Sequence, residues 1–398
     1  MTNENIPTAQ ATLRRSLTFW PLLLYGVAVI VGAGIFVAIA SVIARVGPAA
    51  PLSFLLAGIT AGLTGLCYAE LSSRYPEAAG AAAFVKEGFG SDRVAQFTGV
   101  ALTLAVAVAA ASIASGAVQY LAVFIHLRPA ALIGLLVITF TLLAIAGVRE
   151  SVHFAAAIGM VEILGLLVAS WAGFATAPSV DVVALWPDNL PAWEGVVAGA
   201  FIAFFAFIGF ESLVNMAEET KDPRRTVPYA IICAILVTTS LYIVVAASLV
   251  FSGRGGGSPL LDLFQGPYVR MFAAVGALAV ANGVLVEIMM LARLFYGMAQ
   301  RGQLPAALGR VNPKTQTPIQ ATVTAGGIVL VTALLLPFEQ LLALANALTL
   351  GIFIAVDIAL WLIQRRQAAG DGIFTVPGWV PLVGAALSFG MIVAAAVS

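Results

Sequence analysis

The chain has 398 residues, of which 61% are hydrophobic and 10% are charged, and its formal net charge is zero. Soluble domains carry about 25% charged residues, so this composition excludes a soluble protein and indicates one that crosses a membrane several times. The two cysteines and two histidines (Cys67, Cys233, His126 and His153) are scattered along the sequence, so we expect no disulfide framework, no metal site and no cofactor.

Apolar runs of membrane-spanning length follow one another along the chain and are separated by short loops. A helix crosses a bilayer with about 20 predominantly apolar residues. The first run is too long for the core of a signal peptide and precedes no clear cleavage site, so we expect no processing. The sequence therefore predicts an all-α polytopic membrane protein with eleven spans, at residues 17–44, 50–73, 94–125, 130–147, 152–176, 195–218, 227–251, 269–299, 318–337, 340–363 and 376–397.

The distribution of lysine and arginine over the loops predicts the orientation of the chain. If the N-terminus is cytoplasmic, fourteen of the 19 lysines and arginines lie in the tail and the cytoplasmic loops, four lie in external loops, and Arg293 lies within the eighth span. Cytoplasmic loops of membrane proteins hold the excess of positive charge. We therefore expect a cytoplasmic N-terminus and, with eleven spans, an external C-terminus. The short termini favour a prokaryotic plasma membrane, the bacterial inner membrane.

Two glycines interrupt the first predicted span. Gly32 and Gly34 flank Ala33 within an otherwise apolar run. Glycine is disfavoured in a helix by about 1 kcal/mol relative to alanine, and unpaired backbone in hydrocarbon is tolerated only where it lines a polar cavity or binds a ligand. Taken alone, these glycines are equally compatible with close packing between helices.

The sixth span carries a matching interruption. Gly209 lies near its middle and is followed two residues later by Glu211, an ionisable side chain that is costly inside a membrane. Interrupted helices at corresponding positions of two five-helix halves indicate an inverted-repeat transporter with its substrate at the midplane. The pair of interruptions therefore favours two broken helices over two packing contacts.

Four longer motifs carry a resemblance to a known family. In chain order they are Gly26-x5-Gly32-Ala33-Gly34-Ile35-Phe36, Tyr68-Ala69-Glu70-Leu71-Ser72-Ser73-Arg74-Tyr75-Pro76-Glu77-Ala78-Ala79-Gly80, Phe204 to Glu211 with Ala217 to Arg225, and Arg293-x2-Tyr296-Gly297-Met298-Ala299-x2-Gly302-x-Leu304-Pro305. This set resembles the motifs of the amino acid–polyamine–organocation (APC) permeases, and the resemblance covers nearly the whole chain.

The resemblance implies a LeuT-type fold of two inverted five-helix repeats, with discontinuous first and sixth helices, and uptake or exchange of amino acids by alternating access. It divides the chain into a cytoplasmic tail (1–16), a first repeat (17–176), an external loop (177–194), a second repeat (195–366) and a peripheral eleventh helix (367–398). Family members usually have twelve spans, so the predicted count of eleven departs from the family pattern.

The two breaks predict how a substrate binds. Unwinding of the first span from Val31 to Gly34 exposes amide groups at the start of its second half, where the helix dipole favours the carboxylate of an amino acid. Carbonyl groups freed at both breaks would accept hydrogen bonds from the ammonium group. The breaks and the resemblance together imply substrate-binding positions at Ile30, Val31, Gly32, Ala33, Gly34, Ala206, Phe207, Ile208 and Gly209, with Phe205 as an aromatic gate over the substrate.

Ionisable residues within spans are unfavourable in the membrane unless they are paired or have a function. They are therefore candidates for coupling transport to protons. Glu162 lies in span five, where sodium-independent relatives can carry a lysine facing span one, and Glu211 adjoins the second break. We expect both to bind and release protons, although Glu211 is equally compatible with a structural hydrogen bond. Asp357 in span ten receives no role. Structural roles are expected for the i,i+4 pair Glu70 and Arg74, and for Glu287 and Arg293.

Span eight has no serine or threonine between Tyr268 and Arg301, although the sodium site of this fold needs hydroxyl oxygens there. We therefore expect sodium-independent transport, by proton symport or substrate exchange. Apolar residues in spans three, eight and ten favour a small or neutral amino acid, while the glutamates leave exchange of polyamines or other organocations open.

The sequence has no channel filter motif and no nucleophile–base pair of an enzyme. The expected partners are an amino acid and the lipid bilayer, without nucleic acid, and the oligomeric state stays open.

Overall fold

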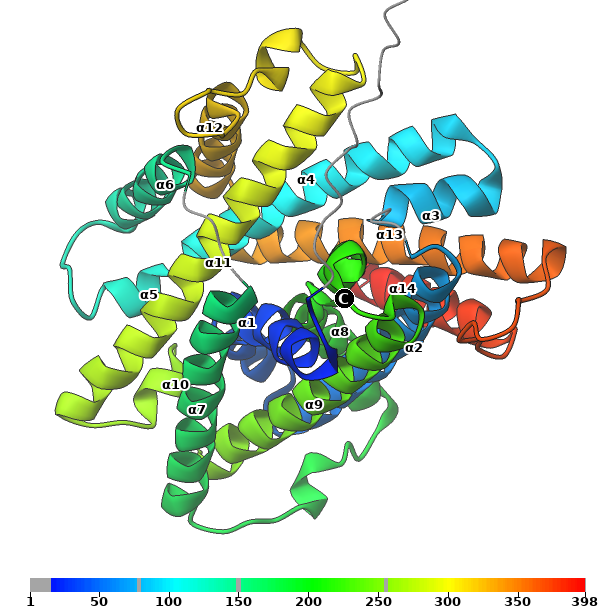
Figure 1. The fold of residues 1–398 in the computed structure, drawn as a ribbon. Coiled ribbons are helices and arrows are strands. Elements are labelled where there is room, and N and C mark those ends of the chain that lie inside the picture. Colours follow the sequence, from blue (N-terminus) through cyan, green and yellow to red (C-terminus); the bar gives the residue numbers. More distant parts are fainter. Residues whose placement is uncertain (1–15, 77–79, 148–151, 254–256, 398) are drawn as a thin grey trace, which may run out of the picture.

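The computed structural model describes residues 16–76, 80–147, 152–253 and 257–397, and these residues form a bundle of helices (Figure 1). The described chain contains the α-helices α1 (Phe19–Val46), α2 (Ala50–Arg74), α3 (Gly80–Phe89), α4 (Asp92–Gly116), α5 (Val118–Leu121), α6 (Pro129–Ile145), α7 (Val152–Thr176), α8 (Leu190–Ala203), α9 (Pro223–Ser252), α10 (Pro259–Asp262), α11 (Pro267–Gln300), α12 (Ile319–Leu335), α13 (Phe338–Arg366) and α14 (Val380–Val397). The 3₁₀ helices are η1 (Gly47–Ala49), η2 (Val183–Leu185), η3 (Phe204–Phe207), η4 (Phe210–Glu219) and η5 (Ala306–Gly309).

Each of the eleven apolar runs contains a helix of this set. Eight helical stretches of the described chain are long and apolar enough to cross a membrane, and one of them, Phe19–Arg74, combines α1 and α2. The helices α6 and α12 are also apolar but have only 17 residues each. The fold is thus that of an all-helical polytopic membrane protein, as the composition predicted, and the number of eleven spans stays a prediction.

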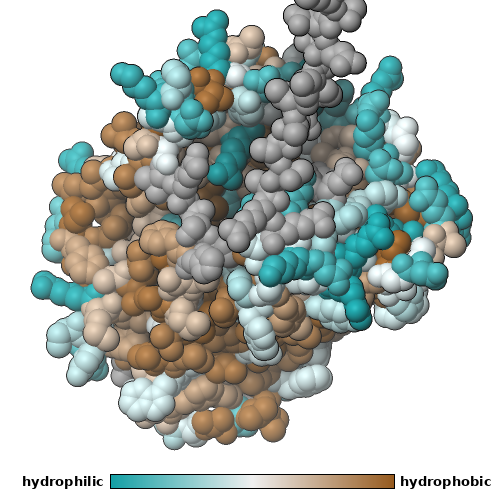
Figure 2. Space-filling model, in the orientation of Figure 1, coloured by the Kyte–Doolittle hydropathy of each residue, from teal (hydrophilic) through white to brown (hydrophobic). Residues whose placement is uncertain are grey.

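The surface of the protein fits contact with lipid. Hydrophobic side chains cover much of the face seen in Figure 2, and hydrophilic ones gather toward its top and right. Large exposed hydrophobic side chains include Trp171 on α7, Leu236 on α9 and Leu335 on α12. Soluble monomers rarely expose continuous apolar patches above a few hundred Å², so these side chains are expected to face acyl chains.

The helix boundaries differ from the expected spans at a few places. The connection between the second and third runs contains α3, which buries Phe84 and Val85. Helix α8 begins within the predicted external loop, because the side chain of Asn189 accepts the Ala192 N–H at 3.0 Å and caps its first turn. The expected N-terminal tail up to residue 15 and Glu77, Ala78 and Ala79 of the second motif lie outside the described residues.

Helices α1, α2, α9 and α13 pack extensively on their neighbours. Helix α2 lies alongside α9, α1 packs on α7 and α9, and α13 lies against α4 and α14 (Figure 1). The ring of Tyr68 on α2 makes edge-to-face contacts with Phe84, Phe210 and Phe353, at centroid distances of 5.9, 5.6 and 5.6 Å. This aromatic cluster therefore holds α3 and η4 against the α2/α13 pair.

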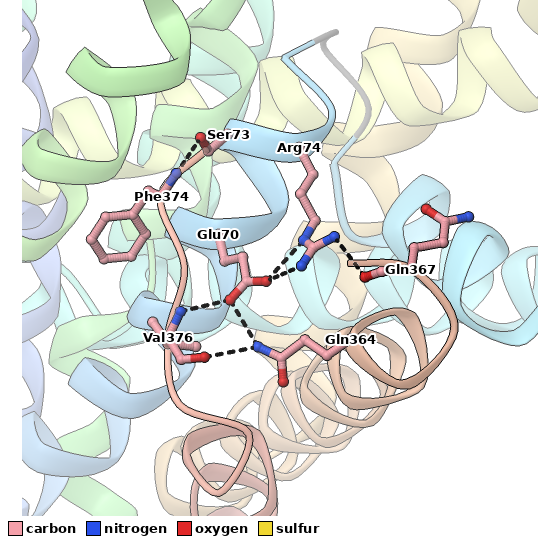
Figure 3. Close-up of polar contacts among 7 residues, drawn as sticks. All are labelled: Glu70, Ser73, Arg74, Gln364, Gln367, Phe374 and Val376. Atoms are coloured by element: carbon pink, nitrogen blue, oxygen red, sulfur yellow. Dashed lines mark hydrogen bonds and ion pairs between the residues drawn. The ribbon is translucent and has the colours of Figure 1, made fainter. Parts of the chain in front are cut away.

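A buried carboxylate on α2 fastens the connection between α13 and α14 (Figure 3). Glu70 is fully buried, and its carboxylate accepts hydrogen bonds from three different groups. These donors are the Arg74 guanidinium, the Gln364 side-chain amide and the Val376 backbone N–H, each at 2.8 Å. Ser73 adds a bond from the same helix, because its Oγ accepts the Phe374 N–H at 2.9 Å. The segment leading into α14 is thus tied to the end of α2.

Glu70→Gln should destabilise the protein, because the neutral amide removes the counterion of the Arg74 guanidinium. It also replaces one of the two acceptor oxygens by a donor. Breaking a buried pair in this way costs about 3–5 kcal/mol. Thermal unfolding of the purified protein in detergent should show a lower Tm. The control is Lys86→Gln, because Lys86 pairs with Asp92 at 2.8 Å on the exposed surface and its loss should leave the Tm unchanged. An unchanged Tm in Glu70→Gln would contradict this role.

Candidate functional site

The first predicted break lies at the expected place but is shorter than expected. Helix α1 is helical throughout except at Gly32, whose backbone angles are φ −2° and ψ −141°. The sequence predicted unwinding from Val31 to Gly34, whereas the departure is confined to this one residue. This single non-helical residue kinks α1, and the chain is helical on both sides of it.

The second break separates the two halves of the sixth span. Helix α8 continues as η3 to Phe207, after which Ile208 is extended, with φ −61° and ψ 134°. Gly209 follows with φ 123°, and η4 begins at Phe210. L side chains rarely adopt such a positive φ. The break therefore requires glycine at position 209.

The two breaks lie against each other. A Cβ added to Gly34 would lie 2.8 Å from the Cα of Ala206, a distance that real Cβ atoms do not show. A Cβ on Gly209 would meet Val29 Cγ1 at 3.0 Å. Each break therefore depends on a glycine that lets the other chain segment approach closely.

A tyrosine on α9 connects the carbonyl ends of both breaks. The hydroxyl oxygen of the fully buried Tyr242 lies 2.9 Å from the carbonyl oxygen of Ile30 and 2.9 Å from that of Ala206. A hydroxyl has one proton to donate, and each carbonyl oxygen has two lone pairs. The Ile30 carbonyl, which the sequence predicted to be free, thus already has a partner, and it keeps a second lone pair.

A cavity of about 550 Å³ adjoins both breaks. This volume lies in the range of roughly 300–1,000 Å³ that small-molecule sites occupy. Of the ten predicted binding and gate residues, seven line the cavity: Ile30, Gly32, Ala33, Gly34, Phe205, Ile208 and Gly209. The other three, Val31, Ala206 and Phe207, are fully buried behind its wall.

The opposite wall comes from α4, α11 and α13, the helices of predicted spans three, eight and ten. Most of its side chains are apolar, as expected, and Asn282, Glu287 and Thr349 add polar groups. The apolar members include Val106, Ala109, Ile113, Val286, Ile352 and Phe353. The cavity is therefore a mainly apolar chamber with a few polar groups.

The cavity extends to one end of the bundle, where its lining becomes polar. The residues there include Lys86, Asp92, Gln96, Arg301 and Gln303. The Lys86 ammonium donates a hydrogen bond to the Asp92 carboxylate, and this bond raises the pKa of Lys86. All five residues belong to loops and helix ends that the charge distribution predicts to be cytoplasmic. The cavity is thus oriented toward the predicted cytoplasmic side.

Two carboxylates belong to the cavity wall. Glu211 Oε2 accepts the backbone N–H of Gly209 at 2.9 Å, which caps the start of η4. Glu287 lines the same cavity and interacts electrostatically with Glu211. Its Oε2 is buried and has no hydrogen-bond partner among the residues that the structure describes. Among the described residues that line the cavity, the cationic side chains are Lys86 and Arg301, and both lie at its polar end, away from the breaks.

Two other predicted ionisable residues lie away from the cavity. Glu162 on α7 is 1% exposed and interacts electrostatically with Tyr242, so it lies behind the first break. Arg293 is exposed on α11 and lines a separate cavity of about 130 Å³ with Thr315 and Thr317. The structure therefore groups Glu211 with Glu287, while Glu162 is linked to the breaks through Tyr242.

Tyr242 was not among the predicted site residues, and Tyr68 was named only as the first residue of a motif, without a role. Tyr242 bridges the breaks, and Tyr68 lines the cavity. The available signal was a tyrosine hydroxyl within an apolar run, because such a group needs a partner when water is absent.

Comparison with known proteins identifies several relatives of the chain. Residues 17–398 match the sequence model of a family described as amino acid permease. The chain is 30% identical over 405 residues to a methylthioribose transporter of Bacillus subtilis, an alignment that covers 94% of this chain and 86% of that protein. It is 28% identical over 414 residues to the branched-chain amino acid permease BcaP of the same bacterium, with 96% and 88% covered.

A plant protein is also similar. The chloroplastic cationic amino acid transporter 9 of Arabidopsis thaliana is 32% identical over 337 residues, which represent 77% of this chain. The matched region covers 59% of the plant protein, so this chain spans well under two thirds of that relative.

Gly34→Ala should weaken amino acid binding without preventing membrane insertion. The added Cβ would force α1 and η3 apart and displace the backbone groups that are expected to bind the substrate, so we expect the Kd to rise at least about tenfold, which corresponds to about 1.4 kcal/mol. Equilibrium binding of labelled amino acids to purified protein measures this effect. The control is Gly62→Ala, because an added Cβ meets nothing within 4 Å at this glycine of α2. Wild-type affinity in Gly34→Ala would refute the expected effect.

Tyr242→Phe should lower both stability and amino acid affinity, because two buried carbonyls lose their common donor. An unsatisfied buried polar group costs about 1–3 kcal/mol. The control is Tyr120→Phe, which removes an equally buried hydroxyl that donates to the Phe36 carbonyl at 2.8 Å, beyond the break. We expect this control to lower the Tm while retaining affinity. Equal amino acid affinity in Tyr242→Phe and Tyr120→Phe would show that the Tyr242 hydroxyl has no role in substrate binding.

Proposed function

Because the chain belongs to the amino acid permease family, we propose that it carries an amino acid across a membrane by alternating access, as a sodium-independent secondary active transporter. The observation that carries this proposal is the cavity of about 550 Å³ against two broken helices. Broken helices persist inside a membrane where their backbone lines such a cavity. The relatives named above are transporters and permeases, not enzymes.

The proposed architecture is a LeuT-type pair of inverted five-helix repeats, at 17–176 and 195–366, followed by a peripheral eleventh helix. Its support is the position of the breaks, since each lies in the first spanning helix of its half. In a bacterial inner membrane with the N-terminus inside, the cavity would face the cytoplasm. With this orientation, the geometry would correspond to an inward-facing state of the transport cycle.

The proposed binding mode uses backbone groups at the breaks. The carboxylate of the amino acid would accept N–H groups near Ala33 and Gly34, where α1 resumes after its kink and the dipole favours an anion. The ammonium group would donate to carbonyls at the second break, near Ile208. Phe205, which is 3% exposed on the cavity wall, would close over the bound substrate.

The side chain of the substrate has two candidate classes. The apolar wall of α4 and α13 favours a neutral amino acid. The uncompensated Glu287 favours instead a second positive charge, as in a cationic amino acid or a polyamine, because a buried carboxylate is costly without a partner. One relative is named for cationic amino acids and another for branched-chain amino acids, so both classes have support.

Coupling to protons or to exchange is proposed through Glu162 and Glu211. Glu211 caps the second break, and Glu162 interacts electrostatically with the tyrosine that joins the two breaks. A change of charge on either carboxylate would act on the broken helices that bind the substrate. Span eight has no serine or threonine whose hydroxyl oxygen could bind sodium.

Uptake into proteoliposomes tests this function. Labelled alanine, leucine, arginine and putrescine, each with the others as competitors, should give saturable uptake and counterflow of at least one compound without sodium. Glu162→Gln should keep counterflow and lose the pH dependence of uptake. Sodium-dependent uptake would refute the proposed coupling, and the absence of any saturable flux would refute transport.

A further inference from the structure

A second, smaller cavity lies at the edge of the bundle, where α6, α11 and α12 pack against one another (Figure 1). Its volume is about 130 Å³, and its lining includes Arg293 on α11, Thr322 on α12 and the loop residues Thr315 to Pro318. Sites for small molecules usually occupy roughly 300–1,000 Å³. This cavity is thus suited to one compact group rather than to a whole small molecule.

The cavity lies at the predicted cytoplasmic boundary of the membrane. Gly147 is the last residue of the predicted fourth span, Pro318 is the first residue of the ninth, and both line the cavity. Arg293 lies six residues before the end of the eighth span, which corresponds to about 9 Å along α11. Arginine side chains near the ends of spans extend toward the interface. The guanidinium is therefore expected at the depth where phospholipid headgroups begin.

The threonine hydroxyls of the cavity hold its walls together. Thr317 donates to the Ile145 carbonyl at 3.0 Å, which joins the loop to the end of α6. The hydroxyl oxygens of Thr315 and Thr317 lie 2.7 Å apart, and Thr315 is the donor because Thr317 has only one proton. Thr322 donates to the Pro318 carbonyl at 3.1 Å. These hydroxyls thus build the cavity without offering a proton to a ligand.

Arg293 supplies the charge of this cavity and is not paired within the described chain. Neither a hydrogen bond nor an ion pair joins its guanidinium to another described residue. Helix α6 and the sequence from Arg293 to Phe338 contain no aspartate or glutamate. Glu287, the acidic residue of α11, is six positions away, outside the spacing at which helix side chains meet, and lines the larger cavity. A charge that is costly within a span thus has no counterion from these segments.

Apolar and basic side chains flank the cavity in the order that a phospholipid requires. On the side of the membrane interior, Leu142 on α6 and Val323 on α12 are exposed. On the predicted cytoplasmic side, Arg310 and Lys314 are exposed on the connection that leads to α12. A surface that is apolar below the cavity and basic above it matches acyl chains joined to an anionic headgroup.

We propose that this cavity binds the phosphate group of an anionic phospholipid of the cytoplasmic leaflet, with the Arg293 guanidinium as its counterion. The planar guanidinium donates two parallel N–H groups to phosphate oxygens. The acyl chains lie on the exposed apolar surface of α6 and α12, and Lys314 adds positive charge beside the headgroup. Basic pockets between membrane helices on the cytoplasmic side bind such headgroups in other proteins. The site is separate from the substrate cavity and does not depend on the proposed transport function.

A purely structural role for Arg293 explains less. An arginine that joins two helices is expected to bond a group on the neighbouring element, as Arg366 does when it donates to the Gly88 carbonyl at 2.9 Å. Arg293 makes no such bond to the residues that the structure describes. The contact between the loop and α6 is made by Thr317 instead. The guanidinium is thus left for a ligand from outside the described chain.

Lipid binding to the purified, delipidated protein in detergent tests the proposal. Phosphatidylglycerol should bind at least about fivefold more tightly than phosphatidylcholine, which is the contribution of one basic residue beside an anionic surface. Arg293→Gln should abolish this preference. The control is Arg270→Gln, which removes an exposed positive charge near the other end of the same helix and should retain the preference. Native mass spectrometry during a lipid titration measures the affinities.

Several results would overturn the lipid site. Equal affinity of the wild type for both lipids, or an unchanged preference in Arg293→Gln, would do so. A rise in Tm with sodium phosphate that equals the rise with phosphatidylglycerol, measured against sodium chloride at the same ionic strength, would assign the cavity to a free anion.

A labelling experiment on the wild type replaces the variant if Arg293→Gln does not fold. A photoactivatable phosphatidylglycerol should label α6, α12 or the connection before α12. Labelling confined to other helices would overturn the proposal.

Discussion

The structure depends on one constraint, which is that backbone polar groups inside a membrane must find partners. Helix α1 and the α8/η4 pair both break within their spans, and each break would leave such groups unpaired. The partners come from three directions. Tyr242 serves a carbonyl from each break, Glu211 serves the Gly209 amide, and the cavity leaves the remaining groups for a ligand.

The same constraint explains how the half-helices at the polar end of the cavity are held together. Before α1, the backbone N–H groups of Ser16 and Leu17 donate to the Glu219 carbonyl at 2.9 and 3.0 Å. The Lys221 N–H returns a bond to the Leu17 carbonyl at 2.8 Å. The first half of α1 and η4 are thus joined at their ends as well as at their breaks, which makes them one structural unit beside the cavity opening.

The large features of the fold were predictable from the sequence because they depend on local composition. Long apolar runs predict the helices. Gly32 and Gly209 indicate the breaks, because glycine is unfavourable within a helix unless packing or function requires it. The extent of the first break was not predictable, because whether one residue or four leave the helix depends on packing against Ala206.

The polar partners were harder to predict, because they come from distant helices. Tyr242 lies more than 200 positions after Ile30, and its hydroxyl bridges the carbonyls of Ile30 and Ala206. No periodicity or motif in the sequence predicts this contact. Glu70 and Arg74 were recognisable as a pair, but their connection to Gln364 and Val376 depends on how the chain returns after α13. The grouping of Glu211 with Glu287 has the same origin, since it needs η4 and α11 on one cavity.

In the proposed binding mode, the substrate carboxylate binds to amide groups just after Gly32. A cryo-EM structure of the protein in lipid nanodiscs with a transported amino acid tests it most directly. We expect density for the amino acid in the cavity, with its carboxylate within hydrogen-bond distance of the Ala33 or Gly34 amide. Density elsewhere in the molecule, or a carboxylate bound to a side chain away from both breaks, would contradict it.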